Sequence, residues 1–149
     1  MKTFVASAFA FLVAFSAVSV YAEKVDISKV KCLVSGAAAK EDKSADYKGG
    51  KVYFCCGNCL KKFTDDSKSF AAKANHQLIA SGQVTQGACP FSGGDLNKDA
   101  SVEFKGAKIG FCCNNCKGKA EKMSDDEKLD KLFGDAAYEK AKFAKAESK

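Results

Sequence analysis

The stretch VYFCCGNC at residues 52–59 occurs twice, because IGFCCNNC follows 57 residues later, at residues 109–116. The same shift relates Cys32 to Cys89, so the eight cysteines form two sets of four with identical spacing. The residues after these two cysteines also agree, since CLVSG starts at Cys32 and CPFSG starts at Cys89. Similarity at a fixed period indicates that the chain contains two copies of one small cysteine-rich module.

Each copy predicts a β-hairpin that leads directly into a pair of adjacent cysteines. In the first copy, the alternating segments 45–47 and 51–55 flank Gly49-Gly50, and the second copy has the same arrangement around Gly106-Ala107. Glycine at the first central position of a two-residue loop favours a type II′ turn. Strands and helices in one small module indicate the α+β fold class.

Helices are predicted after each hairpin. In the first copy, Asn58 is a candidate cap for a helix that starts at Cys59, and a further cap signal precedes a helical run over residues 67–80. In the second copy, Ser124 and Glu127 have the spacing of a capping box, which predicts a helix that ends at Gly134.

The chain is predicted to consist of four parts, the first of which is an export signal. Module 1 is expected at residues 23–80, a polar glycine-containing linker at 81–87, and module 2 at 88–149. Module 2 includes a helical extension, whose last helix is predicted over residues 135–146.

The export signal is predicted at residues 1–22. Lys2 gives a charged start, residues 4–20 are almost entirely apolar, and Ala22 provides the small residue that a signal peptidase reads. The alternative is a retained membrane anchor, but the apolar run is short for a bilayer span and no positive cluster follows it. We therefore expect a periplasmic or secreted protein that has no membrane partner after cleavage.

Charge gives no indication of a nucleic-acid partner. Lysine accounts for all 24 basic residues, and the chain without Lys2 has 23 lysines against 18 acidic residues. A basic excess can indicate binding to nucleic acid. Here the lysines are interleaved with acidic residues, and arginine, which recognises bases and phosphates, is absent. We expect a solvated surface.

The cysteines require a chemical explanation. A module of roughly 55 residues has a marginal hydrophobic core, which metals or disulfides usually supplement. An even number of cysteines in an exported protein is typical of a disulfide framework. A thiolate metal site in each module is the other interpretation.

The spacing favours the metal site. In the first copy it is Cys32-x22-Cys55-Cys56-x2-Cys59. A hairpin end followed by a helix start brings Cys55 close to Cys59, and the helix N-terminus favours the thiolate form that binds metal. Strand alternation puts Cys56 on the same side as Val52 and Phe54. We therefore prefer Cys55 over Cys56 as a ligand, and likewise Cys112 over Cys113.

These residues resemble the TRASH/YHS domain family. The resemblance rests on Cys-x22-Cys-x3-Cys, on the aromatic strand that ends in Phe-Cys and on the Cys-x-x-Ser-Gly start, and it covers residues 30–75 and 87–123. It implies two tandem treble-clef-like modules and a role in heavy-metal trafficking, resistance or sensing. The metal ligands that it implies are Cys32, Cys55, Cys59, Cys89, Cys112 and Cys116.

One departure from zinc-ribbon-like relatives affects the choice of metal. Where such relatives have a second cysteine in the first turn, this chain has Ser35 and Ser92. Three thiolates per module remain, and either Cys56 and Cys113 supply a fourth ligand or the fourth position stays open. Such a set suits Cu(I) as well as Zn(II), and we expect about one ion per module.

Other chemistry-bearing residues have simpler interpretations. His76 could be a fourth ligand for the first site, but the second copy has no counterpart, so we expect a surface or interface histidine. Aromatic residues of the hairpins are expected in the core. The pairs Asp65-Asp66 and Asp125-Asp126 stand at helix starts, where acidic side chains act as caps.

Three functions remain open at this stage. The preferred one is an exported, non-enzymatic protein that buffers, delivers or senses copper or zinc, because motifs for phosphate binding and hydrolysis are absent from the sequence. The second is a disulfide-stapled interaction module. The third is a thiol–disulfide redox protein that uses Cys56-x-x-Cys59 and its copy, although a thioredoxin-type context is missing.

Overall fold

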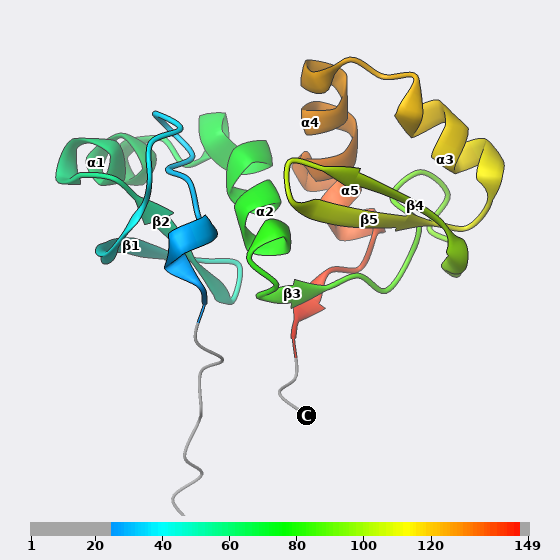
Figure 1. Ribbon diagram of the computed structural model, residues 1–149, viewed down its shortest axis with the longest axis horizontal. Coiled ribbons are helices and arrows are strands. Elements are labelled where there is room, and N and C mark those ends of the chain that lie inside the picture. The colour runs from blue at the N-terminus through cyan, green and yellow to red at the C-terminus, as the bar shows by residue number, and fades with distance from the viewer. Residues whose placement is uncertain (1–24, 147–149) are drawn as a thin grey trace, which may run out of the picture.

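The computed structural model describes residues 25–146, so the predicted export signal lies outside the described residues. It has the predicted α+β architecture, with two similar halves, each a hairpin followed by helices (Figure 1). No helix in the described part of the chain is long and apolar enough to cross a bilayer.

The first half runs from the N-terminal side to the centre of the molecule. Its elements in order are the 3-10 helix η1 (Ile27–Lys29), β1 (Lys40–Tyr47), β2 (Gly50–Phe54), α1 (Gly57–Asp65), the 3-10 helix η2 (Lys68–Phe70) and α2 (Ala71–Ala80).

The second half repeats this order and adds material at the end. Its elements are β3 (Val84–Thr85), β4 (Asn97–Phe104), β5 (Ala107–Phe111), α3 (Asn114–Glu121), α4 (Asp125–Phe133), α5 (Asp135–Lys140) and β6 (Ala144–Lys145). The hairpins β1–β2 and β4–β5 are antiparallel, and each has a register shift at the same place in its first strand.

The hairpins are confirmed, but the predicted turns are displaced by one residue. The loops consist of Lys48-Gly49 and Lys105-Gly106, and φ is positive at all four residues (45° and 80°, then 48° and 84°). Positive φ at both central residues is typical of a type I′ turn, whose twist matches that of the flanking strands. The type II′ prediction was therefore wrong.

The helix predictions hold with different boundaries. α1 begins at Gly57 with Cys56 as its N-cap, so Asn58 lies inside the helix. The predicted run over residues 67–80 divides into η2 and α2. Ser124 forms the predicted capping box with Glu127.

The C-terminal segment differs more from its prediction. α5 is a helix of six residues, and Lys142 then has a φ of +50°, a left-handed conformation that ends helical structure. The chain continues into β6, which pairs with β3 in the predicted linker. The final helix predicted over residues 135–146 is therefore wrong beyond Lys140.

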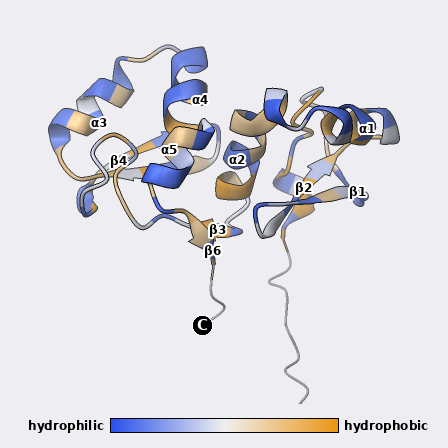
Figure 2. Cartoon of the chain, turned by 180° about the vertical axis from the view of Figure 1, so that it is seen from behind, coloured by the Kyte–Doolittle hydropathy of each residue, from blue (hydrophilic) through white to orange (hydrophobic). Residues whose placement is uncertain are grey.

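Helix α2 lies between the two halves. It follows the first hairpin in the chain but packs against α4, α5 and β5 of the second half as well as β2 of its own half. In Figure 2, α2 carries many hydrophobic residues in the middle of the molecule, whereas α1 and α3 at the two ends are mainly hydrophilic. Ile79 and Phe143 contact the cores of both halves.

The aromatic residues of the hairpins lie in the core, as predicted. Phe54 and Phe111 are fully buried, and Tyr53 and Phe104 are each 7% exposed. Phe54 packs on Phe63 of α1, with their ring centroids 5.3 Å apart.

Polar side chains on α2 also join the halves. The Asn75 side-chain amide donates to the carbonyl oxygen of Phe133 at 2.8 Å and to Asp135 Oδ1 at 2.9 Å. Lys48, from the first hairpin turn, forms an ion pair of 2.6 Å with the same Asp135 carboxylate. The two halves are therefore connected by buried hydrogen bonds as well as by apolar contacts.

His76 is an interface histidine, which is one of the two predicted placements. Its Nε2 lies 3.0 Å from the carbonyl oxygen of Phe104, and its ring packs edge-on against the rings of Phe104 and Phe133. Burial lowers the pKa of His76 below its usual value of 6.5, and the positive charge of Lys105 adds to this effect. The neutral imidazole is therefore the form that fits between the halves.

Glutamine side chains occupy the outer edge of each hairpin. Gln77 accepts from the backbone N–H of Tyr53 at 2.7 Å and donates to the Tyr53 carbonyl at 3.0 Å. Gln86 makes the same two bonds with Gly110, at 2.8 and 2.9 Å. Gly110 is the counterpart of Tyr53 in the repeat, so a side-chain amide replaces a neighbouring strand at the same place in both copies.

Replacing the buried glutamine should destabilise the fold. Gln77→Leu leaves the Tyr53 amide, the Tyr53 carbonyl and the Lys31 carbonyl without their hydrogen bonds. Unpaired buried groups of this kind cost about 2–4 kcal/mol in total, which urea unfolding of the reduced protein would measure. The control is Gln83→Leu, which removes two bonds to exposed Lys51, where water can take their place. Equal losses in the two variants would contradict this account.

Stability should fall in mild acid because of His76. The folded protein holds the neutral imidazole, and the unfolded chain binds a proton near pH 6.5. The contribution of this residue is therefore complete above pH 6.5 and is lost as the pH falls through the lowered pKa of the folded state. His76→Gln keeps a hydrogen-bond donor without titrating, so its unfolding free energy should decline less than that of the wild type between pH 7 and pH 5. Parallel pH profiles would refute the assignment.

Candidate metal centre

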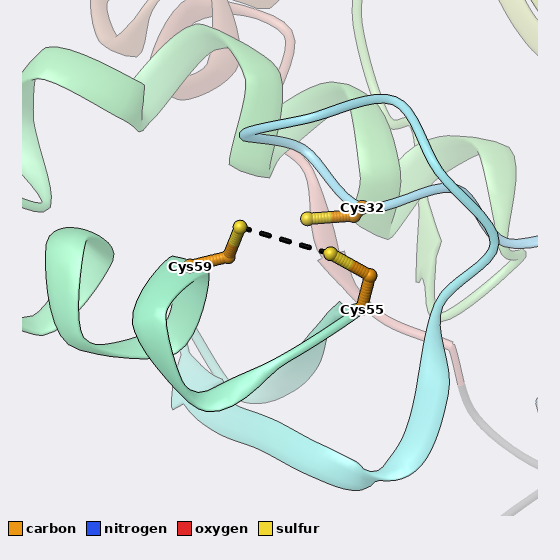
Figure 3. Close-up of side chains that lie close together, drawn as sticks. All are labelled: Cys32, Cys55 and Cys59. Atoms are coloured by element: carbon orange, nitrogen blue, oxygen red, sulfur yellow. Dashed lines mark hydrogen bonds between the residues drawn. The ribbon is translucent and has the colours of Figure 1, made fainter.

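The side chains of three cysteines converge at the junction of the first hairpin with α1 (Figure 3). Cys55 follows the last residue of β2, and Cys59 lies in the first turn of α1. Cys32 comes from the turn that precedes the hairpin and is 2% exposed. The three sulfur atoms all lie within 4.8 Å of one another.

The Cys32 turn has the same geometry in both copies. The Cys32 carbonyl accepts from the Gly36 amide at 2.8 Å, and the Cys89 carbonyl accepts from the Gly93 amide at 2.8 Å. Gly36 and Gly93 have φ values of 75° and 73°, a conformation that glycine adopts without strain. The Ser-Gly pair recognised in the sequence therefore reverses the chain just after the first cysteine.

Sulfur–sulfur distances are those of an array that can share one ion. Cys55 Sγ lies 3.7 Å from Cys59 Sγ, and Cys112 Sγ lies 3.7 Å from Cys116 Sγ. A tetrahedral ion with metal–sulfur bonds of about 2.3 Å needs sulfur atoms about 3.8 Å apart. These two pairs fit this requirement, whereas a disulfide requires a sulfur–sulfur separation of about 2.05 Å. All eight cysteines are free thiols in the structure.

The second triad reproduces the first. Cys89, Cys112 and Cys116 also lie within 4.8 Å of one another, and Cys89 is fully buried. The six cysteines named as candidate ligands from the sequence are therefore brought together in two groups of three, one in each half.

The serines that replace a cysteine lie beside the triads. Ser35 Oγ is 3.2 Å from Cys55 Sγ, and Ser92 Oγ donates to Cys112 Sγ, also at 3.2 Å. Each hydroxyl is therefore close enough to its triad that a cysteine at the same position could supply a fourth thiolate. The sequence showed the substitution but not this contact, which depends on how the first turn folds back onto the end of β2.

The serines also influence ionisation. Burial opposes ionisation of Cys32, but hydrogen bonds from the Ser35 side chain and from the amides of Ser35, Cys55 and Val34 together outweigh it and lower the pKa of Cys32 to about 6. Ser92 has the same effect on Cys89, whose pKa is also about 6. Burial and the neighbouring thiols raise the pKa of Cys59 to about 12. The metal-free triad thus holds its first cysteine as a thiolate and its third as a thiol, which must lose a proton to bind metal.

Cys56 does not lie where the sequence placed it. Strand alternation put it with Val52 and Phe54, which are fully buried, but Cys56 is exposed. The reason is that β2 ends at Phe54 and the chain turns at Cys55-Cys56 into α1. Its sulfur lies 3.8 Å from Cys55 Sγ, and the corresponding distance from half-buried Cys113 to Cys112 is 3.7 Å.

Residues outside the triads have structural roles. His76 bonds to Phe104 in the interface. Asp66 accepts from the Ser69 amide at the start of η2, and Asp125 forms an ion pair of 3.0 Å with Lys105. A cavity of about 560 Å³ between the halves contains both lysine and aspartate side chains, so its lining has no single charge sign.

No protein-family model, no curated protein and no solved structure matches the chain. The similarity to the TRASH/YHS family therefore rests on the residues quoted above. The structure itself establishes the coarser point that two cysteine clusters in repeated modules could each hold a metal ion.

Removing the serine hydroxyls should make the first thiols less acidic. In metal-free reduced protein, Ser35→Ala should raise the pKa of Cys32 above about 6, because the hydroxyl no longer stabilises the thiolate. Thiolate absorbance followed against pH would show one ionisation moving upward, and Ser92→Ala should act in the same way on Cys89. Ser69→Ala, which affects only the bond to Asp66, is the control. An unchanged titration in both variants would contradict the role of the serines.

Proposed function

We propose that this is an exported, non-enzymatic protein that binds one soft transition-metal ion at each cysteine triad and buffers, delivers or senses that metal. The observation that carries the proposal is the duplicated array of three sulfur atoms with a spacing that suits metal coordination. The pattern of residues 1–22 supports export.

Thiolate ligands limit the choice of ion. Sulfur ligands select Cu(I) and Zn(II) over magnesium, calcium and manganese, which prefer oxygen. A sulfur–sulfur distance of 3.7 Å suits tetrahedral Zn(II), with a fourth ligand completing the site. A set of three thiolates beside a serine hydroxyl equally suits trigonal Cu(I). The proposal covers both ions.

The position of the triads supports binding rather than catalysis. Cys32 and Cys89 are almost completely buried, and Cys59 is 9% exposed. A catalytic metal needs an open position at which substrate meets a polarised water. Here each ion would lie between a buried turn and the first turn of a helix. The helix N-terminus was expected to favour the thiolate form of Cys59, but burial and the neighbouring thiols raise the pKa of Cys59 instead, so a bound cation would have to displace its proton.

One experiment distinguishes metal binding from the disulfide-stapled module. The protein is purified anaerobically from the periplasm, its intact mass is measured with and without thiol alkylation, and its metal content is determined on the same sample. About two metal ions per chain, released as the thiols become alkylatable, support the proposal. No metal and a mass lower by two hydrogens per cysteine pair would establish disulfides instead.

The two triads should behave as separate sites. Cys55→Ser removes a ligand of the first triad and leaves the second triad unchanged, since the ligand sets share no residue. Metal content should therefore fall by half, and the reciprocal Cys112→Ser should give the same value. Elemental analysis after dialysis measures both variants. Complete loss of metal in either variant would mean that the two halves share one site.

A further inference from the structure

We propose that Cys56 and Cys113 are exchange ligands, through which the metal held by each triad is passed to an external thiolate acceptor. This inference rests on the proposed metal binding. Three cysteines of each set hold the ion, and the fourth cysteine serves its release.

Cys55 is the link between the triad and the surface. Its sulfur is 3.7 Å from Cys59 Sγ on the inner side and 3.8 Å from Cys56 Sγ on the outer side. Cys112 is likewise 3.7 Å from both Cys116 and Cys113. The fourth sulfur in each copy is therefore about as close to the shared cysteine as the helix cysteine of the triad is.

In the first copy the four cysteines become more exposed in the order Cys32, Cys59, Cys55, Cys56. Cys32 is 2% exposed, Cys59 is 9% exposed, Cys55 is half-buried and Cys56 is exposed. An acceptor from solution can reach Cys56 without opening the fold, whereas it cannot reach Cys32. In the second copy Cys89 is fully buried, whereas Cys112, Cys113 and Cys116 are all half-buried. In both copies an ion would therefore leave away from the buried first cysteine.

Ligand exchange at this array requires no redox partner. Cys56 loses its proton to solvent as its sulfur binds the metal, and the metal–sulfur bond to Cys32 breaks. The Cys32 sulfur is released as a thiolate, so the step frees one proton, while the ion remains bound to Cys55, Cys56 and Cys59 and keeps its charge. An acceptor thiolate next replaces these ligands from the exposed side, so each step exchanges one thiolate for another.

The first arm of the test separates holding from exchange. Cys56→Ser with Cys113→Ser should still bind two Zn(II) or, anaerobically, two Cu(I) ions, because both triads remain. Serine is a favourable N-cap, so the variant should keep α1 and α3 intact. Circular dichroism and metal analysis check both points. Cys59→Ser with Cys116→Ser is the matched control and should lose the ions.

The second arm measures transfer. Metal-loaded protein is mixed with an excess of a dithiol acceptor peptide, and metal transfer is followed by stopped flow. We expect the Cys56/Cys113 double variant to transfer about tenfold or more slowly than the wild type, because the acceptor must then attack an ion held only by the less exposed sulfurs of the triads. An unchanged transfer rate, or loss of the ions from this variant before transfer, would overturn the exchange role. A wild-type protein that binds no metal would instead refute the proposed function.

Discussion

The junction of two residues between each hairpin and its first helix determines the site. β2 ends at Phe54 and α1 begins at Gly57, so Cys55 and Cys56 must carry the chain from a buried strand to a helix that packs on it. Phe54 is held in the core against Phe63, which fixes the direction of α1. Cys59 in its first turn can then only face back toward Cys55. One aromatic contact and one short turn thus place these two sulfurs without any metal.

The remaining sulfur of each triad is positioned by backbone geometry. The Cys32 turn is closed by its own glycine, and its serine reaches the end of β2. Holding several thiols together costs electrostatic free energy once they ionise, because like charges repel. The serine hydroxyls and backbone amides offset part of this repulsion at Cys32 and Cys89. A bound cation would remove the remaining repulsion between the thiolates. The sulfur positions are therefore set before metal binds, but their negative charge is neutralised only by the metal.

Much of this architecture could be predicted from the sequence, because the repeat and the cysteine spacing can be recognised without knowing the fold. The α+β class, the hairpins, the capping box at Ser124 and the grouping of six cysteines all follow from spacing. Three features could not be predicted in this way. The turn type depends on φ at lysine, the exposure of Cys56 depends on where β2 ends, and the end of α5 depends on the pairing of β6 with the linker. The first two depend on backbone angles and strand ends that residue type does not fix, and the third depends on a pairing between distant segments.

The glutamine amides at the hairpin edges have a consequence for a chain that contains two copies of one module. Open strand edges are templates for self-association, and tandem repeats of similar sequence are prone to exchange strands between copies or between molecules. Gln77 is the counterpart of Gly134 and Gln86 is the counterpart of Lys29, so each edge is covered by a glutamine that the other copy lacks. The duplication has therefore diverged where mispairing would start, while its cysteines have kept their spacing.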